Sequence, residues 1–266
     1  MNKETTTLDV CELFYSLQGE GVSLGRPAVF LRLAKCNLCC GCGTLVEEGK
    51  ATWTCDSQAV MKDFEVQTPA EVFERLKKLG DAAYVGVLLG EVNLVVTGGE
   101  PTVYKEGVTQ FLGLIDRESV LYQQSLRIPT QSMRPPVYEI ETNGTIFSGP
   151  SQFYDRFSFV NCSPKLANSG MARDKRIVPF ALIEISKHPS HFFKFVVSSE
   201  KDWEEINEDF IKPGFAHPQR IFLMPAGATR DEMIANSAVV WKMAMDHHML
   251  ATTRLHIIAW DTKKSI

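Results

Sequence analysis

Apolar and polar residues alternate with two different periods along the chain. Short apolar runs rich in Val, Ile and Phe are typical of buried β-strands, and between several of them apolar residues recur at helical spacing. The expected strands are Ala28–Leu33, Asn93–Thr97, Val137–Glu141, Phe157–Cys162, Phe192–Val197, Arg220–Leu223 and Leu255–Trp260. Alternating strands and helices predict an α/β fold with a mostly parallel sheet, either open or closed into a barrel.

Two capping boxes mark helix starts between these strands. The segment Thr68–Glu71 places a capping threonine before a proline at the first helical position, and apolar residues follow at helical spacing as far as Leu79. The segment Thr229–Glu232 begins a second helix, which we expect to continue to about His248. A third helix is expected from about Glu106 to Asp116.

Two segments interrupt the alternation. Gly41–Thr54 carries glycines and charges without a clear period, and we expect an inserted loop there. Glu118–Pro136 is polar, contains three prolines and is expected to be a long surface connection. Because the sequence shows no repeat and no interdomain linker, residues 1–266 are expected to form a single domain.

The composition narrows the class of protein. With 266 residues, 44% of them hydrophobic, the chain can bury a full core. Its formal net charge of −4 argues against a nucleic-acid partner, which usually needs a basic surface. No apolar run reaches the roughly 18 residues that cross a membrane. We therefore expect a cytoplasmic protein without a membrane partner, whose seven cysteines are reduced.

Polar residues directly follow three of the predicted strands. Thr97 leads into Gly98–Glu100, while Glu141–Gly144 and Ser163–Lys165 lie just past the next two strands. The carboxyl ends of parallel strands lie together in an α/β fold and collect ligands. The glycines allow a ligand to approach the backbone closely. The pattern predicts a ligand-binding site at this edge of the sheet.

Arg32 lies inside an apolar strand, on the same face as Ala28 and Phe30. A buried guanidinium needs an anion, so Arg32 either forms a structural ion pair or clamps a substrate carboxylate with two hydrogen bonds. Upstream, the glycine-rich loop Leu17–Gly21 can present backbone donors and acceptors to a planar heterocycle. By contrast, His256 is expected to be a core histidine within its strand.

Five cysteines crowd one stretch of the chain: Cys36, Cys39, Cys40, Cys42 and Cys55. With the spacing C-x3-C-x14-C, Cys36, Cys40 and Cys55 can give three thiolates to an iron–sulfur cluster and leave one iron open to a small molecule. A closed structural zinc site would use four cysteines instead. Spacing alone leaves both kinds of metal centre open.

Together these motifs resemble the radical S-adenosylmethionine (SAM) enzymes and, among them, the 7-carboxy-7-deazaguanine synthase (QueE) family. The TGGEP motif is shared by the superfamily. The LQGEG loop, the arginine four residues before the first cysteine and the RLHIIAW segment are more specific. The matching segments are Phe14–Gly21, Gly25–Phe30, Arg32–Leu38, Cys55–Ser57, Thr97–Pro101, Glu141–Gly144, Ser163–Lys165, Lys194–Val197 and Arg254–Trp260.

The resemblance implies a modified, partial TIM-type (β/α) barrel with an inserted loop in the cluster-binding region. It implies a [4Fe–4S] cluster on Cys36, Cys40 and Cys55. Because this chain expands the family's second spacing to fourteen residues, Cys39 and Cys42 are alternatives to Cys40. SAM would be surrounded by residues of several loops: Thr54, Cys55, Asp56, Gly99, Glu100, Glu141, Ser163, Pro164, Lys165, Met224, Pro225, Ala226 and Gly227.

The same resemblance assigns residues to a substrate and a second metal. The substrate would be held by Leu17, Gln18, Gly19, Arg32, Thr97 and the carboxylate of Ile266. Ser57, where the family commonly has threonine, would bind a magnesium ion that orients the substrate. Either hydroxyl offers the oxygen that this hard cation prefers.

The activity implied by the resemblance converts 6-carboxy-5,6,7,8-tetrahydropterin to 7-carboxy-7-deazaguanine and ammonia, in the pathway to preQ0 and queuosine. A radical formed from SAM takes hydrogen from C6 of this substrate, whose ring then contracts. Relatives suggest a homodimer and an electron donor such as flavodoxin. Two alternatives stand beside this one: an activase of glycyl-radical enzymes, which lacks the LQGEG and RLHIIAW motifs, and a non-catalytic zinc-binding module.

Overall fold

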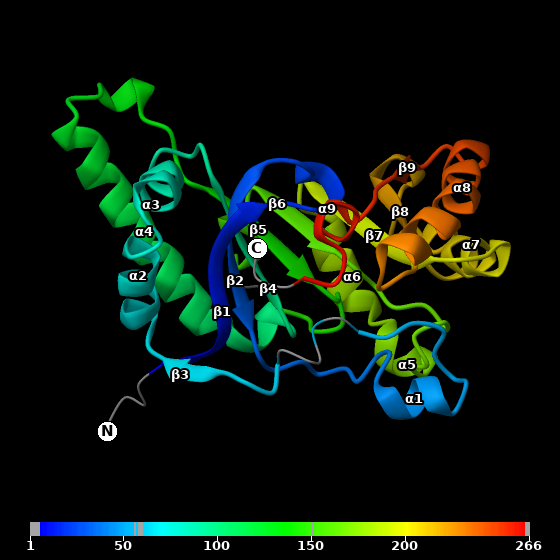
Figure 1. The fold of residues 1–266 in the computed structure, drawn as a ribbon. Helices are drawn as coiled ribbons and strands as arrows, with labels where there is room; N and C mark the ends of the chain where they lie inside the picture. The colour runs from blue at the N-terminus through cyan, green and yellow to red at the C-terminus, as the bar shows by residue number, and fades with distance from the viewer. Residues whose placement is uncertain (1–5, 56, 58–60, 150–151, 264–266) are drawn as a thin grey trace.

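The computed structural model describes residues 6–55, 57, 61–149 and 152–263, and these form one nine-stranded sheet (Figure 1). The strand order is β3-β1-β2-β4-β5-β6-β7-β8-β9. From β2 through β4 to β9 all neighbours are parallel, whereas β1 pairs antiparallel with β2 and β3. The strands are β1 Leu8–Leu17, β2 Pro27–Leu33, β3 Glu65–Gln67, β4 Asn93–Gly98, β5 Val137–Thr142, β6 Phe159–Cys162, β7 His191–Val197, β8 Ile221–Pro225 and β9 Leu250–Ala251.

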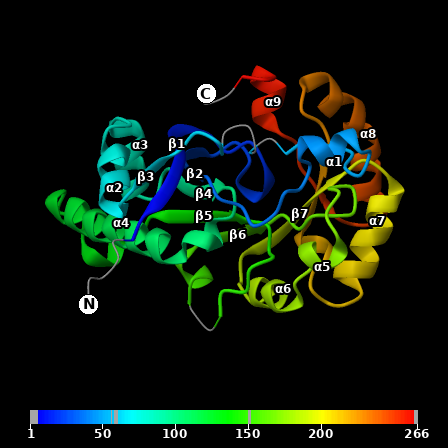
Figure 2. The same cartoon turned by 90° about the horizontal axis from the view of Figure 1, so that it is seen from below.

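The helices cover the two faces of the sheet differently. In Figure 2, α4 and α6 lie on one side of the sheet, while α1 and α9 lie on the other. The α-helices are α1 Gly43–Glu47, α2 Pro69–Lys77, α3 Asp81–Leu88, α4 Lys105–Ser125, α5 Arg173–Arg176, α6 Pro179–Ser186, α7 Glu200–Ile206, α8 Arg230–Asp246 and α9 Leu255–Trp260. This open, mostly parallel α/β arrangement agrees with the partial barrel expected from the sequence.

Alternate residues of the central strands point to opposite faces of the sheet. Val29, Leu31 and Leu33 of β2 pack in the main core with residues of α2, α3 and α4. Ala28 and Phe30 pack on the other face, as predicted. The same alternation along β4 to β7 leaves a row of polar residues on that second face: Asn93, Thr97, Glu139, Glu141, Asn161 and Lys194.

The main hydrophobic core joins both halves of the chain. It runs from Leu8 in β1 to Met249 beside β9 and includes residues of every strand from β4 to β8. One continuous sheet with one large core is in keeping with the single domain expected of residues 1–266, which stays a prediction.

Both predicted capping boxes are present. The side chains of Thr68 and Thr229 accept from the backbone N–H three residues later, and the glutamates there reach back to the capping residues. The short apolar run Leu255–Trp260, however, is helix α9 and not the expected strand. The N–H groups of Ile257 and Ile258 both donate to the carbonyl of Arg254 at 3.0 Å. Because such short runs fit either period, the sequence pattern did not decide between them.

The polar segment Glu118–Pro136 is only partly a surface connection, because α4 continues to Ser125. Ser119 and Gln123 are buried in this helix, and both donate hydrogen bonds to the carbonyl of Leu88. Their polarity therefore marks buried hydrogen bonds and not exposure. Gly41–Thr54 is a loop, as expected, although it contains the short helix α1.

Candidate active site

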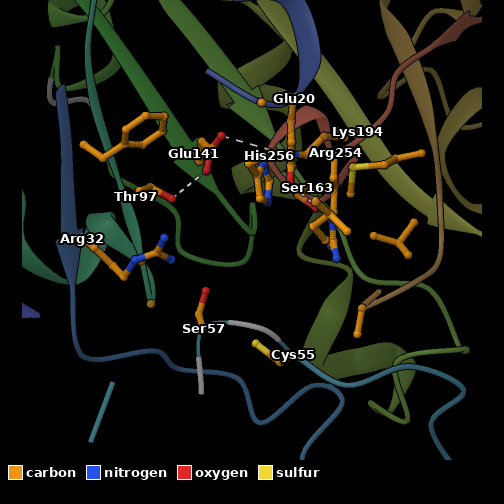
Figure 3. A pocket seen from close by; sticks show the side chains of 18 of the residues that line it. Glu20, Arg32, Cys55, Ser57, Thr97, Glu141, Ser163, Lys194, Arg254 and His256 are labelled. Atoms are coloured by element: carbon orange, nitrogen blue, oxygen red, sulfur yellow. Dashed lines mark hydrogen bonds and ion pairs between the residues drawn. The ribbon is translucent and has the colours of Figure 1, made fainter. Parts of the chain in front are cut away.

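A cavity of about 500 Å³ opens on the polar face of the sheet (Figure 3). Its walls come from β1, β2, β4, β5, β7 and β8, from the loops after β2 and β6, and from α9. Figure 3 shows Cys55 and Ser57 on one side and Glu20, Lys194 and Arg254 on the opposite side. A cavity does lie at the predicted edge of the sheet, and it has two chemically different ends.

Three cysteines line one end of the cavity. They are Cys36, Cys40 and Cys55, and neither Cys39, which is exposed, nor Cys42 is part of the lining. The thiols of Cys40 and Cys55 lie in hydrogen-bond contact. The sulfur of Cys36 accepts from the backbone N–H of Leu38 at 3.5 Å. We name this region the cysteine end.

The donor set at the cysteine end fits an iron–sulfur cluster. Burial raises the pKa of Cys36, and the contact with Cys55 together with burial raises that of Cys40, so both thiols are neutral until a metal displaces their protons. Within the described ranges no three Cys, His, Asp or Glu side chains gather around a point suited to one metal ion. Thiolates of a cluster bind different irons, so the three cysteines need not converge on a single point.

The opposite end of the cavity holds a buried ion-pair network. Lys194 of β7 bonds to Glu20 in the loop after β1, and the guanidinium Nε of Arg254 lies 3.3 Å from the Glu20 carboxylate. Burial alone would raise the pKa of Glu20, but Lys194 and Arg254 together hold it below its usual range. Glu20 is therefore an anion inside the protein at all ordinary pH values. We name this region the ion-pair end.

Glu141 lies beside this network and connects three elements. Its carboxylate accepts from the Thr97 hydroxyl at 2.6 Å and from the Gln18 amide at 3.3 Å. The ammonium of Lys194 lies 3.9 Å away. These partners come from β4, the end of β1 and β7, so Glu141 fixes three strand ends relative to one another.

Backbone and side-chain hydrogen bonds attach α9 to the loop after β1. The N–H of Leu255 donates to the carbonyl of Gly19 at 2.8 Å, and the N–H of Gly21 donates to the hydroxyl of Thr252 at 2.9 Å. His256 of α9 lines the cavity and does not lie in a strand core, so its expected role was wrong. A Cβ on Gly19 would lie 2.2 Å from the His256 ring, which explains the glycine there.

No family model matches the chain, but curated proteins resemble it along nearly its whole length. It is 33% identical to the 7-carboxy-7-deazaguanine synthase of Pyrobaculum aerophilum over 98% of both chains. It is 29% identical to that of Halobacterium salinarum over 96% of this chain and 91% of the relative. The chain belongs to the 7-carboxy-7-deazaguanine synthase family. The resemblance drawn from its motifs is therefore confirmed, and membership argues against the activase and the zinc-binding module.

The fold agrees with that family. The crystal structure of QueE from Escherichia coli matches the chain with a TM-score of 0.60, covering 95% of this chain and 99% of that one at 18% sequence identity. This likeness confirms the α/β fold of the family. Over the described residues, no helix is both long and apolar enough to span a bilayer.

The residues assigned to SAM from the sequence can now be compared with the lining of the cavity. Several of them line the cavity: Thr54, Cys55, Gly99, Glu141, Ser163, Lys165 and Met224. Others lie outside its lining: Glu100, Pro164, Pro225, Ala226 and Gly227. Asp56, like Ile266 of the substrate set, falls outside the described residues. The remaining substrate-set residues line the cavity: Leu17, Gln18, Gly19, Arg32 and Thr97.

Two residues of the TGGEP motif have structural duties. Glu100 is fully buried and accepts from the hydroxyls of Thr102 and Thr142 and from the N–H of Asn143. It therefore braces the turn and does not offer its carboxylate to a ligand in the cavity. A Cβ on Gly99 would lie 2.1 Å from the carbonyl oxygen of Lys35. This glycine is required because the end of β4 packs directly on the chain leaving β2.

Sequence reasoning missed the residues of the ion-pair end. Lys194 interrupts an apolar strand, as Arg32 does, and the same argument about a buried cation applied to it. Glu20 and Arg254 lie inside motifs that were recognised, yet nothing in a single sequence pairs positions so far apart. Their pairing depends on how α9 packs over the cavity.

Proposed function

We propose that the chain is a radical SAM lyase that converts 6-carboxy-5,6,7,8-tetrahydropterin to 7-carboxy-7-deazaguanine and ammonia. One observation carries the proposal: a single cavity joins Cys36, Cys40 and Cys55 to the LQGEG loop. Near full-length similarity to proteins named for this activity supports it. The product belongs to the 7-deazaguanine pathway to preQ0 and queuosine.

At the cysteine end, Cys36, Cys40 and Cys55 hold a [4Fe–4S] cluster. The cluster and SAM supply the radical chemistry when bound, and the protein binds, orients and excludes water. SAM lies against the cavity residues Thr54, Gly99, Glu141, Ser163, Lys165 and Met224. Trp53 adds an apolar wall, because it packs with Val196 and Met224 beside the cysteines.

Arg32 binds the substrate carboxylate. Its Nε donates to Glu12, and its terminal nitrogens Nη1 and Nη2 make no hydrogen bond to the described residues. Figure 3 shows its side chain pointing into the cavity. The side chain of Gln18 is buried and bonded within the protein, so the loop Leu17–Gly19 offers the substrate mainly its backbone groups.

Ser57 binds the magnesium ion in this proposal. It lines the cavity beside Cys55, on the side that faces Arg32 (Figure 3). Its carbonyl accepts from the N–H of Met61 at 3.0 Å, so the backbone of Ser57 takes part in a local turn while its side chain reaches the cavity. Mg2+ usually takes one or two protein oxygens and completes its shell with substrate and water.

The proposal extends to the surroundings of the enzyme. A single-electron donor such as flavodoxin reduces the cluster, the chain works as a homodimer, and it acts in the cytoplasm without nucleic acid. The negative formal charge of −4 supports the last point.

Anaerobic reconstitution with iron and sulfide tests the function. The reconstituted protein should be brown, cleave SAM after reduction and release 7-carboxy-7-deazaguanine and ammonia from the carboxypterin. Cys36→Ala is the matched control, because it removes one ligand from the cavity and should lose both colour and turnover. SAM cleavage without any turnover of the carboxypterin would contradict the proposed substrate.

A further inference from the structure

Glu139 lies beneath the cavity and outside its lining. It sits on β5 two residues before Glu141, so both side chains point to the polar face of the sheet. Glu139 is fully buried. A carboxylate in such a place is costly unless hydrogen-bond donors surround it, so its partners reveal what it does.

Amide groups from three other elements converge on the Glu139 carboxylate. Gln18 Nε2 donates to Oε1 at 3.1 Å, Asn93 Nδ2 donates to Oε2 at 3.4 Å, and Asn161 Nδ2 also donates to Oε1. These donors lie at the end of β1, on β4 and on β6, and each is buried. The hydroxyl of Ser23 adds a further hydrogen bond. The carboxylate is thus held by neutral donors from every neighbouring element.

The ionic surroundings of Glu139 differ from those of Glu20. No Lys or Arg among the described residues forms a salt bridge with Glu139, and the charged group that faces it is Glu141. Burial and this second carboxylate raise the pKa of Glu139 to about 7. Without an oppositely charged partner, Glu139 does not stabilise the fold as an ion pair would. Its role therefore depends on where its oxygens point.

Gln18 connects the Glu139 carboxylate to the loop that lines the cavity. Its Nε2 bridges Glu139 and Glu141, while its Oε1 accepts from the N–H of Glu20 at 3.2 Å. Its backbone N–H donates to the carbonyl of Arg26 at 2.7 Å. An amide that is fixed at both its nitrogen and its oxygen can adopt only one of its two flipped orientations. The turn Gln18–Glu20 therefore takes its shape from the bond to Glu139.

We propose that Glu139 is a positioning residue, whose Oε1 fixes the amide of Gln18 and so holds the loop Leu17–Glu20 in the shape that binds the pterin. The role rests on the proposed function, since it concerns the proposed binding of the pterin in the same cavity. It requires an acceptor oxygen at position 139 and does not require a charge. Glu139→Gln keeps one such oxygen for Gln18 and Asn161, whereas Glu139→Met keeps none.

Equilibrium binding of 6-carboxy-5,6,7,8-tetrahydropterin to the reconstituted protein with SAM, measured anaerobically, tests this role. Glu139→Met should weaken binding by roughly tenfold, the effect of losing the hydrogen bond that fixes the Gln18 amide. Glu139→Gln should stay within about threefold of the wild type. Cluster absorbance and SAM affinity should not change in either variant.

A double-mutant cycle with Gln18→Met separates positioning from general damage. If Glu139 acts through Gln18, adding Glu139→Met to Gln18→Met should change pterin affinity by less than about twofold. Ser119→Ala is the structural control, because it loses a buried hydrogen bond on the far face of the sheet; it should lower the melting temperature without changing pterin affinity. Independent, multiplying effects in the cycle, or equal losses in the Gln and Met variants, would overturn the role of Glu139. A wild type that binds no pterin would instead overturn the proposed function.

Discussion

Arg32 and Glu12 face each other across the β1–β2 pair, and Nε of Arg32 donates to Oε2 of Glu12 at 2.8 Å. The sequence left two roles open for this arginine, a structural ion pair or a clamp on a substrate. The geometry accommodates both, because the ion pair uses Nε and leaves the two terminal nitrogens on the cavity side. Glu12 therefore orients the guanidinium, while its terminal nitrogens keep the geometry that the proposed substrate carboxylate requires.

Arg32→Lys should weaken binding of the carboxypterin by on the order of ten- to a hundredfold, because lysine keeps the charge but loses the two-pronged geometry. SAM affinity should stay the same. Anaerobic binding of each ligand to the reconstituted protein measures both. Arg156→Lys is a matched control, since that arginine pairs with Asp116 away from the cavity. Unchanged carboxypterin affinity in Arg32→Lys would remove Arg32 from the substrate site.

Cys40→Ala should abolish the visible absorbance of the reconstituted cluster, as should Cys36→Ala and Cys55→Ala. Cys39→Ala and Cys42→Ala should keep it, because neither side chain lines the cavity. Iron content and absorbance per chain give the measurement. The assignment is wrong if Cys42→Ala bleaches the protein while Cys40→Ala leaves it brown.

Ser57→Ala should lower turnover without reducing cluster absorbance, and extra magnesium should restore activity only in part. The hydroxyl is the protein's proposed ligand to Mg2+, and the methyl group of alanine offers no oxygen to this hard cation. Ser57→Thr keeps the oxygen and should remain active. Turnover with and without a chelator checks the dependence on the metal. Full activity in Ser57→Ala would show that Ser57 takes part only in the local turn and does not bind magnesium.

Glu139 should make the folding stability depend on pH in a defined window. Its pKa is about 7 in the folded protein against 4.5 for an ordinary glutamate side chain, so between these values the folded state binds the proton more tightly than the unfolded state. Stability should therefore fall as pH rises through this window and become level above it. The whole change amounts to about 3 kcal/mol.

Glu139→Gln removes the titrating group and isolates this effect. Urea unfolding of both proteins from about pH 5 to about pH 8 gives the difference in unfolding free energy at each pH. The wild type should lose stability relative to the variant as pH rises. A difference that does not vary with pH would show that Glu139 titrates normally.

The local signals of the sequence predicted much of the fold. The alternation within β2 placed Val29, Leu31 and Leu33 in the core and Arg32 on the ligand face, because a parallel strand with different surroundings on its two faces carries that difference in its side chains. The capping boxes fixed two helix starts for an equally local reason. The segment Leu255–Trp260 was misassigned because its state depends on docking against Gly19 rather than on its own period.

The candidate site was likewise predictable only where its residues lie close together in the sequence. Cys36, Cys40 and Cys55 lie within one stretch of chain, and their spacing, read with the family motifs, selected the three that line the cavity. Glu20 and Lys194 bond to each other although they are 174 positions apart in the sequence. No pattern within either segment indicates the other as its partner. The role of Glu139 could not be predicted for a further reason. A glutamate inside a strand indicates an exposed face of that strand until its buried amide partners are known.

The wall of the cavity formed by α9 rests on polar contacts more than on a core. Ile257 is the one buried residue of this helix, whereas Leu255, Arg254 and Thr252 attach it to the loop after β1 through hydrogen bonds and an ion pair. Segments with few buried apolar contacts open at a small fraction of the free energy needed to unfold the whole protein. Amide hydrogens of α9 should therefore exchange with heavy water long before those of β5. The strength of a few polar bonds, and not the stability of the fold, sets how often the ion-pair end is exposed to solvent.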